Sequence, residues 1–373
     1  MNEGEVERLR SELDEIDRQL VSLAARRQAV VSGIGKAKQS AGRGTRDFRR
    51  EKAVMEHARQ VARELGLEPA TAESLMQVLI QASLTHQEQD RLAASSRGGG
   101  KTALVIGGSG RMGRWFADFL AGQGYGITIA DPAGPVEGHG WLSDWTLSPL
   151  DESLIVVATP LRIADRILHA LAERRPAGLV VEIGSLKAPL KSGLAALASA
   201  GVAAASLHPM FGPDTRLLSG RHVIVVDAGD GAAAVAAGDL FADTMAEVVT
   251  MDLEEHDRLI AWILGLSHAL NIGFFSALTA SAEQAPRLAR MGSTTFDRQL
   301  DVAARVAAEN PDLYWEIQAL NPFGGEVLKA LEDSVSSLRA HVQAGDAAGF
   351  TAMMTRGRDY LAGLADAAAG SRR

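Results

Sequence analysis

The sequence predicts a helical segment, then an α/β domain with a mainly parallel sheet, then a second helical segment. Three observations lead to this fold class. Apolar residues follow a helical period through the first ninety residues, a glycine-rich turn lies between two apolar runs at 102–131, and helical periodicity returns after residue 252. The chain has 373 residues, which is too long for one typical core, so two or three domains are expected.

The composition excludes several classes of function. The sequence contains no cysteine, so it has neither disulfides nor thiolate chemistry, and we predict no metal site. Its net charge of −8 does not favour a nucleic-acid partner. The N-terminus is rich in charged residues, and we identify no apolar run long enough to cross a membrane. We therefore expect a cytoplasmic protein without a membrane partner.

Residues 1–90 predict three helices. The first runs from Glu5 to about Lys38 and, at about ten turns, is long enough to pack against helices of a second chain. The apolar rows of the three helices are continued by polar residues, and such a set is costly to bury without partners. The set predicts a pocket for a small polyanion and consists of Arg27, Lys38, Asp47, Arg50, Glu51, Ser83 and Gln87.

These residues resemble the active-site pattern of the all-helical chorismate mutase domain in the bifunctional enzymes of phenylalanine and tyrosine biosynthesis. The resemblance implies an intertwined dimer that converts chorismate to prephenate. It also implies roles for the polar set: Arg10, contributed across the dimer, and Arg27 hold the carboxylates; Lys38 and Gln87 bind the ether oxygen; Arg50 adds charge near a carboxylate; Asp47 and Glu51 meet the ring hydroxyl; Ser83 completes the pocket.

A small, polar stretch with three consecutive glycines, residues 91–101, predicts a flexible linker to the α/β domain at 102–251. That domain opens with an apolar strand and the turn Gly108-Ser109-Gly110-Arg111-Met112-Gly113. The three glycines form G-x-G-x-x-G, and Asp131 ends the second strand at the distance expected for a ribose ligand. A carboxylate there favours NAD over NADP, although binding of FAD by the same fold stays open.

Further strands are predicted at 154–158, 179–183, 203–207, 222–226 and 247–250, in a doubly wound sheet. Ligands of such sheets bind beyond the carboxyl ends of the strands. His208 follows one strand and is held between prolines and a glycine, which makes it a candidate base. Residues 252–373 predict helices, and an all-helical second half commonly pairs two subunits.

The patterns G-x-G-x-x-G, G-S-x-K and H-P-M-F-G-P-D resemble prephenate dehydrogenase, and their order after a mutase domain resembles the T-protein family of tyrosine biosynthesis. The resemblance implies NAD-dependent oxidative decarboxylation of prephenate to 4-hydroxyphenylpyruvate by a homodimer. His208 would accept a hydrogen bond from the C4 hydroxyl, and Thr159 would lie at the cofactor. Arg305 would hold the ring carboxylate, and His268 lies on a helix of the same site.

Two residues depart from the T-protein pattern. Asp297 stands where that pattern has an arginine, and Arg162 stands where it has a histidine. These departures leave the reaction type unchanged, but they leave open which substrate the enzyme uses. The same scaffold could process 4-amino-4-deoxychorismate and the corresponding prephenate. A regulatory protein that binds ligand without catalysis is the alternative of another class, and the full mutase set together with His208 argues against it.

Overall fold

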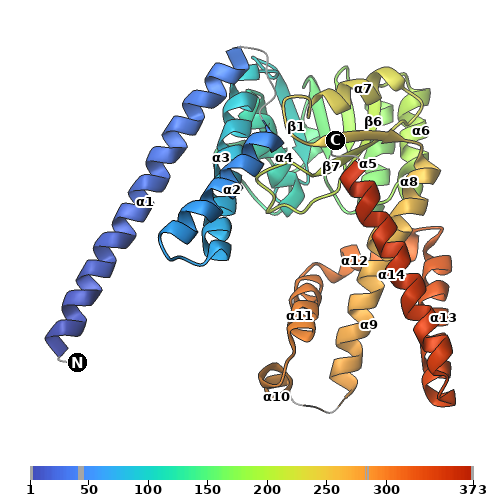
Figure 1. Ribbon diagram of the computed structural model, residues 1–373. Coiled ribbons are helices and arrows are strands. Elements are labelled where there is room, and N and C mark those ends of the chain that lie inside the picture. Colours follow the sequence, from blue (N-terminus) through green and yellow to red (C-terminus); the bar gives the residue numbers. More distant parts are fainter. Residues whose placement is uncertain (1–2, 41–45, 282, 284, 371–373) are drawn as a thin grey trace. The chain divides into compact units, whose positions relative to one another are not determined.

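The computed structural model describes residues 3–40, 46–281, 283 and 285–370. It contains two compact units, Met1–Leu253 and Glu254–Arg373. The first unit holds the three N-terminal helices and an eight-stranded sheet with its connecting helices, and the second is helical (Figure 1). The predicted fold class of helical, α/β and helical parts is confirmed.

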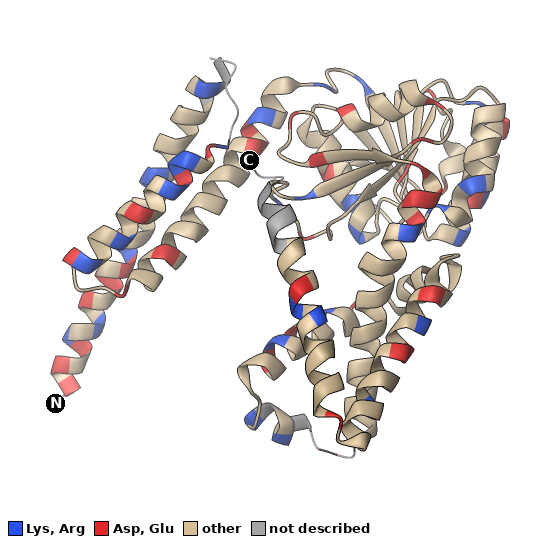
Figure 2. Cartoon of the chain, turned by 45° about the vertical axis from the view of Figure 1, so that its right-hand side comes forward, with Lys and Arg blue, Asp and Glu red and all other residues tan. Residues whose placement is uncertain are grey.

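The first three helices are α1 (Glu3–Ser40), α2 (Phe48–Glu64) and α3 (Pro69–Ser95). The carboxylate of Asp47 accepts the N–H of Arg50 and caps α2, and Pro69 occupies the first turn of α3, where no N–H is needed. Helix α2 packs against α3, and α1 packs against α3. Acidic and basic residues are interspersed along α1 (Figure 2) and form ion pairs such as Arg8–Glu12.

The apolar row of α1 is largely uncovered within one chain. Its large apolar side chains are 45–71% exposed. The row consists of Leu9, Leu13, Ile16, Leu20, Val21, Leu23, Val30 and Ile34. Exposed apolar rows of this length are uncommon on single chains and mark interaction surfaces.

The structure differs from the predicted linker at 91–101. Helix α3 continues to Ser95, and Leu92 is buried in the core of the α/β domain. The N–H of Gly98 then donates to the carbonyl of Gln123 at 2.8 Å. A side chain at position 98 would collide with the backbone of Tyr125, so glycine here serves close packing. The composition indicated flexibility, whereas tertiary contacts place this segment against the sheet domain.

The sheet contains eight strands in the order β3-β2-β1-β4-β5-β6-β7-β8. Every neighbouring pair is parallel except β6 and β7, which are antiparallel. The predicted doubly wound, mainly parallel sheet is therefore confirmed, although the short strand β3 was not predicted. The strands are β1 (Thr102–Ile106), β2 (Gly126–Ala130), β3 (Gly140–Leu142), β4 (Leu154–Val157), β5 (Leu179–Glu182), β6 (Ala204–Pro209), β7 (His222–Val226) and β8 (Glu247–Met251).

Helices connect these strands and cover the sheet (Figure 1). Helix α4 contacts β1 and β2, α5 packs on α6, and α7 contacts β6 and β7. Buried aromatic rings of Phe116, Phe119 and Phe241 join α4 to the end of α7. The elements are α4 (Arg111–Gly122), η1 (Trp145–Leu147), α5 (Leu161–Arg174), η2 (Ala188–Leu190), α6 (Lys191–Ser199) and α7 (Gly231–Asp239).

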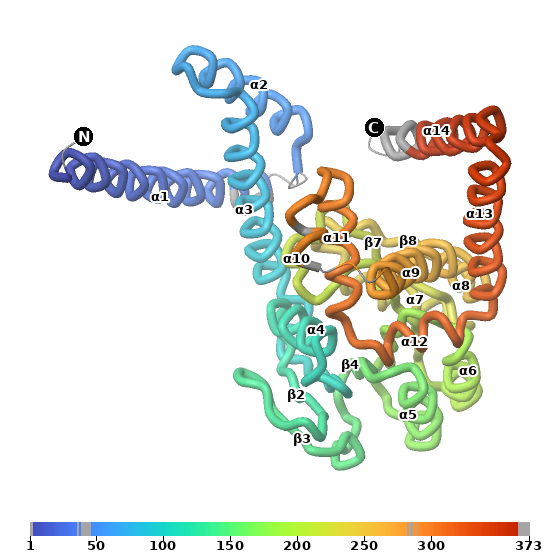
Figure 3. Tube along the Cα trace, turned by 90° about the horizontal axis from the view of Figure 1, so that it is seen from below, coloured from blue at the N-terminus to red at the C-terminus, as the bar shows by residue number. Residues whose placement is uncertain are grey.

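The second unit is built from helices, as predicted for the chain after residue 252. Its elements are α8 (Leu253–Ile260), the π-helix η3 (Ala261–Leu266), α9 (Ser267–Ala280), α10 (Ala285–Arg290), α11 (Thr294–Ala307), α12 (Pro311–Leu320), α13 (Gly324–Ala344) and α14 (Ala347–Gly370). The side-chain amide of Gln318 donates to the carbonyl of Gly265 in η3 at 2.9 Å. Figure 3 shows α13 and α14 in red, joined at Gly345, which adopts a left-handed conformation.

Among the described residues, one continuous helical stretch, Leu253–Ala280, is long and apolar enough by length and composition to cross a membrane. The sequence analysis did not identify it. Within the second unit, α9 packs against α11, and η3 packs against α12 and α13. Only 28% of its most apolar window is buried within the described residues, so packing within one chain leaves much of this apolar surface uncovered.

Candidate functional sites

The structure brings the predicted polyanion set together in one cavity of about 870 Å³ between the first three helices. All seven residues of the set line it: Arg27, Lys38, Asp47, Arg50, Glu51, Ser83 and Gln87. Apolar side chains such as Val54 and Leu75 form much of the remaining wall. A cavity with apolar walls and a few convergent charged groups is the usual form of a small-molecule site.

Arg27 is held in this cavity by two hydrogen bonds to α3. Its Nη1 atom donates to the hydroxyl of Ser83 at 2.7 Å and to the carbonyl of Leu79 at 3.0 Å. Burial lowers the pKa of Arg27 from its ordinary value, but a guanidinium stays charged in proteins. Ser83 in turn donates to the carbonyl of Leu79. The charge of Arg27 is thus fixed by hydrogen bonds between α1 and α3 before any ligand binds.

Gln87 also joins α3 to α1. Its amide nitrogen donates to the carbonyl of Val31 at 3.1 Å. Gly35 makes this approach possible, because a Cβ there would lie 3.2 Å from Cγ of Gln87. The donor group of Gln87 is held on rigid helices, as an electrostatic site requires.

The cavity excludes one residue that was predicted for it and includes two that were not. Arg10 lies outside it, exposed on α1, and pairs with Glu7 at 3.5 Å, so its role across a dimer stays a prediction. Arg26 and His57 line the cavity but were not predicted. Arg26 precedes the predicted Arg27 in the sequence, and His57 lies on α2 between the lining residues Val54 and Ala58. Nothing in the sequence marked either residue as part of a site, except that each lies close in the chain to other lining residues.

The glycine turn after β1 has the close packing that its pattern predicts. A Cβ at Gly108 would lie 2.6 Å from the side chain of Ile129, and one at Gly113 would collide with the carbonyl of Gly107. Gly107 itself adopts a φ of +83°, and this position was not singled out in the sequence. The glycines therefore allow α4 to start against the end of β1.

Asp131 lies directly beside this turn. Its Oδ2 atom accepts the N–H of Ser109 at 3.1 Å, and its Oδ1 atom accepts the N–H of Ala133 at 2.8 Å. Helix α4 begins at Arg111, and its N-cap residue Gly110 provides no side-chain cap, so the first N–H groups of the helix suit a pyrophosphate. On the neighbouring turn the hydroxyl of Thr159 is buried, and no partner for it is found within the described part of the chain. These features fit a dinucleotide.

His208 lies at the same edge of the sheet. The structure places it inside β6 rather than after it, opposite Ile224 of β7, and only 5% exposed. Strands β1, β4, β5 and β6 are parallel, so the end of β6 lies at the same edge as the glycine turn after β1. A buried histidine held in a paired strand has little freedom to move.

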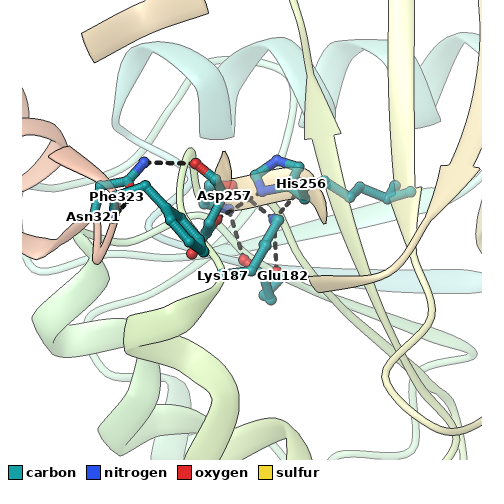
Figure 4. A network of polar contacts seen from close by, with 8 residues as sticks. Glu182, Lys187, His256, Asp257, Asn321 and Phe323 are labelled. Atoms are coloured by element: carbon teal, nitrogen blue, oxygen red, sulfur yellow. Dashed lines mark hydrogen bonds and ion pairs between the residues drawn. The ribbon is translucent and has the colours of Figure 1, made fainter. Parts of the chain in front are cut away.

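A buried ion pair supports this edge and was not predicted. Figure 4 shows the ammonium group of Lys187 beside Glu182, 2.8 Å from Oε1, and both side chains are fully buried. Lys187 also donates to the carbonyls of Gly184 and Leu207 at 2.7 and 2.8 Å. Leu207 precedes His208, so this lysine ties the turn after β5 to the residue before the candidate base. The G-S-x-K pattern was the only sequence signal for it.

We expect the Lys187→Ala substitution to lower the free energy of unfolding by about 3–5 kcal/mol, because it leaves the Glu182 carboxylate buried without its cation. Thermal or urea unfolding measures the loss. The matched control is Lys191→Ala, which removes an exposed lysine four residues later. The double variant Glu182→Leu/Lys187→Met should recover much of the loss; equal stability of the single and double variants would contradict the ion-pair explanation.

Figure 4 also shows a cluster of hydrogen-bonded residues in the second unit. The Nδ1 atom of His256 lies 2.7 Å from the carboxylate of Asp257, and both residues are buried. The side chain of Asn321 donates to the carbonyl of Asp257 at 2.9 Å and accepts the N–H of Phe323. A buried histidine bound to a carboxylate has a fixed tautomer and orientation.

The two predicted substrate residues of the helical unit lie in different surroundings. His268 on α9 stacks on the ring of Tyr314 with centroids 4.1 Å apart, and its burial lowers the pKa of the imidazole. Its Nδ1 atom is buried, and the described residues include no hydrogen-bond partner for it. Arg305 is exposed near the carboxyl end of α11. The contacts therefore support a polar role for His268 more strongly than one for Arg305.

The two departures from the T-protein pattern are exposed at helix starts. Arg162 lies in the first turn of α5, after the turn that carries Thr159. Asp297 lies in the first turn of α11, where a carboxylate is favoured by the helix dipole. The favourable interaction of this carboxylate with the start of α11 is a local, structural explanation for an acidic residue at position 297.

Comparison with known protein families matches two parts of the chain. Residues 9–88 match chorismate mutase type II, and residues 252–356 match the dimerization domain of prephenate dehydrogenase. A T-protein of Enterobacter agglomerans is 24% identical over 95% of this chain and 92% of its own length.

Two further relatives cover the dehydrogenase part. A 4-amino-4-deoxyprephenate dehydrogenase of Streptomyces pristinaespiralis is 30% identical over 69% of this chain and 90% of its own. A crystal structure of prephenate dehydrogenase from A. aeolicus, in complex with hydroxyphenyl propionate and NAD+, is 18% identical. It superposes with a TM-score of 0.57 over 70% of this chain and 97% of that chain, which supports the fold.

Proposed function

Because the chain belongs to the prephenate dehydrogenase family and carries a type II chorismate mutase domain, we propose that it catalyses two consecutive steps of tyrosine biosynthesis. The first converts chorismate to prephenate, and the second converts prephenate to 4-hydroxyphenylpyruvate with NAD. The observation that carries the proposal is the cavity of the first three helices, which is lined by Arg27, Lys38, Gln87 and the other members of the predicted set.

The rearrangement of chorismate needs no nucleophile and no proton transfer. The protein must hold a flexible dianion in its reactive conformer and stabilise negative charge on the ether oxygen as the bond breaks. Arg27 would bind a carboxylate from its fixed position beside Ser83. Lys38 and Gln87 would donate to the ether oxygen, and Glu51 and Asp47 would accept from the ring hydroxyl.

In the dehydrogenase site, residues of the glycine turn and Asp131 would hold NAD, which supplies the hydride acceptor when bound. His208 would accept a hydrogen bond from the C4 hydroxyl of prephenate and take its proton as the carbonyl forms. Loss of carbon dioxide then moves an electron pair into the ring, and the C4 oxygen takes the proton back from His208 to give the aromatic 4-hydroxyphenyl product. Lys187 would keep the backbone before His208 in place through the carbonyl of Leu207. Arg305 and His268 would bind the substrate from the helical unit.

We also propose a cytoplasmic homodimer. The helical unit matches a dimerization domain, and the apolar row of α1 is exposed within one chain. A partner helix packed on this row would cover it and would bring Arg10 of the partner subunit to the mutase cavity. This arrangement accounts for the position of Arg10 outside the cavity of its own chain.

The direct test is NADH formation by the purified protein with prephenate and, in parallel, with 4-amino-4-deoxyprephenate, each over a concentration series. The second substrate is the second candidate because the Streptomyces pristinaespiralis relative is 30% identical and because Asp297 and Arg162 depart from the T-protein pattern. We expect a much higher kcat/KM with prephenate. A preference for the amino compound would instead assign the protein to the amino series, with those two residues as the first to exchange.

A further inference from the structure

The segment that follows His208 is held mainly by residues outside itself. Residues 210–221, here called the β6–β7 segment, connect the end of β6 to the start of β7. They lie at the sheet edge that also carries the glycine turn after β1. Its internal backbone hydrogen bonds are short-range ones, such as that from Arg221 to Leu218. It also contains Gly212 and Gly220, and Gly220 has a φ of +74°. A connection of this kind needs external contacts to hold one conformation.

Helix α4 supplies one set of these contacts. The indole N–H of Trp115 donates to the carbonyl of Thr215 at 2.8 Å, and Arg111 pairs with Asp214 at 3.1 Å. Because Arg111 belongs to the glycine turn, the β6–β7 segment is connected to that turn as well as to His208. The segment thus follows His208 and contacts the first turns of α4, with the Arg111–Asp214 pair exposed at the surface.

The mutase helix α3 supplies a second contact through a buried charge. Figures 1 and 3 show α3 extending from α2 to α4. Near its carboxyl end Glu88 is only 2% exposed, and its two carboxylate oxygens accept the N–H groups of Leu218, at 2.8 Å, and Met245. Burial raises the pKa of Glu88, and the two backbone hydrogen bonds oppose this rise. One side chain thus anchors the β6–β7 segment and the residues before β8.

A third contact comes from Arg46, which lies outside the mutase cavity but binds a residue that lines it. The guanidinium of Arg46 binds both carboxylate oxygens of Glu51, at 2.9 and 3.0 Å, and its remaining nitrogen donates to the hydroxyl of Ser219. Glu51 lines the cavity for chorismate. Leu218 and Ser219 are neighbours, so Glu88 and Arg46 hold adjacent residues of the same turn.

We propose that Glu88 and Arg46 are positioning residues of the dehydrogenase reaction, which the mutase helices supply by anchoring the β6–β7 segment through Leu218 and Ser219. The inference rests on the proposed function, because it concerns the reaction at His208. It assigns to the mutase part a second task, which its own chemistry does not require. Glu88 is not among the residues that line the mutase cavity, although it follows Gln87 in the chain.

The experiment uses the full chain with Glu88→Gln, Ser219→Ala and Ser219→Thr. Glutamine retains only one acceptor oxygen for two N–H groups, alanine removes the acceptor for Arg46, and threonine restores it. We expect the dehydrogenase kcat to fall about tenfold or more in Glu88→Gln, since small displacements of reacting groups have effects of this size. Ser219→Ala should show a smaller loss of kcat, and Ser219→Thr should recover it. Chorismate consumption should stay within about twofold in all three, because each leaves the cavity groups that act on the ether oxygen in place.

Amide hydrogen exchange supplies a readout that is independent of activity. Exchange in peptides that cover 210–221 and 242–247 should be faster in Glu88→Gln. The matched control is Asp90→Asn, which neutralises a carboxylate on the same helix that accepts from Ser32 within the mutase part. This control should change neither kcat nor exchange in those peptides.

Unchanged kcat in both Glu88→Gln and Ser219→Ala would overturn the inference. A parallel fall of both activities together with the melting temperature would overturn it too, because that pattern indicates general destabilisation. Absence of NADH formation by the unmodified protein with either substrate would contradict the proposed function instead. In that case the exchange measurement still decides whether Glu88 anchors the segment.

Discussion

The His208→Asn variant is expected to lose NADH formation from prephenate by about 10²–10⁴-fold, the usual contribution of a general base. Asparagine is similar in size and can accept a hydrogen bond, but it cannot take the hydroxyl proton. His208 is 5% exposed within β6, so this conservative change should leave the strand pairing with β7 intact. The mutase residues lie on the first three helices, and chorismate consumption should therefore be retained. A spectrophotometric assay of NADH and of chorismate on the same preparation measures both.

His169→Asn is the matched control for this variant. His169 lies on α5, is partly exposed and contacts the hydroxyl of Ser192 at 3.1 Å, so the same substitution there should leave both rates unchanged. A His208→Asn protein that forms NADH at the rate of the unmodified protein would remove His208 from the reaction.

Lys38→Ala is expected to show the reverse pattern. Chorismate consumption should fall by about 10²–10³-fold, the effect of removing one donor aimed at developing negative charge. NADH formation from added prephenate should be retained, because the dehydrogenase residues belong to other elements. Lys38 lines the mutase cavity near the end of α1, where its ammonium group can reach a ligand between the helices.

The control for Lys38→Ala is Lys52→Ala. Lys52 lies on α2, is exposed and does not belong to the residues that line the cavity, so its loss changes the net charge equally without removing a donor. Normal chorismate consumption by Lys38→Ala would contradict the assigned role. A rate that falls equally in the Lys52 variant would point to a general effect of charge.

Several features of the fold could be predicted because they depend on neighbouring residues in the chain. The period of apolar side chains distinguishes helices from strands, and the glycine turn with Asp131 specifies how one strand passes into one helix. The polar set of the first three helices could be found because charged residues on an apolar row are costly to bury, so they indicate a ligand.

Other features depend on residues far apart in the chain. Lys187 and Glu182, which form the ion pair, are only five residues apart in the chain. The contact of Lys187 with Leu207, however, requires two strands to lie side by side. Glu88 gave no sequence signal, since a glutamate on a helix is ordinary until α3 is packed on the sheet domain. The linker at 91–101 was predicted from its small residues, which suit both a flexible connection and close packing, and the structure shows that α3 continues to Ser95.

The sequence by itself determined the order of the three fold classes, the NAD-binding turn, the candidate base and the mutase set, because each follows from local period, spacing or residue type. Only the tertiary structure decided that seven residues from three helices line one cavity, and that Arg46 and Glu88 reach the segment after His208. The physical reason is that hydrogen bonds and burial depend on distances in space, and packing sets those distances between residues that are remote in the chain.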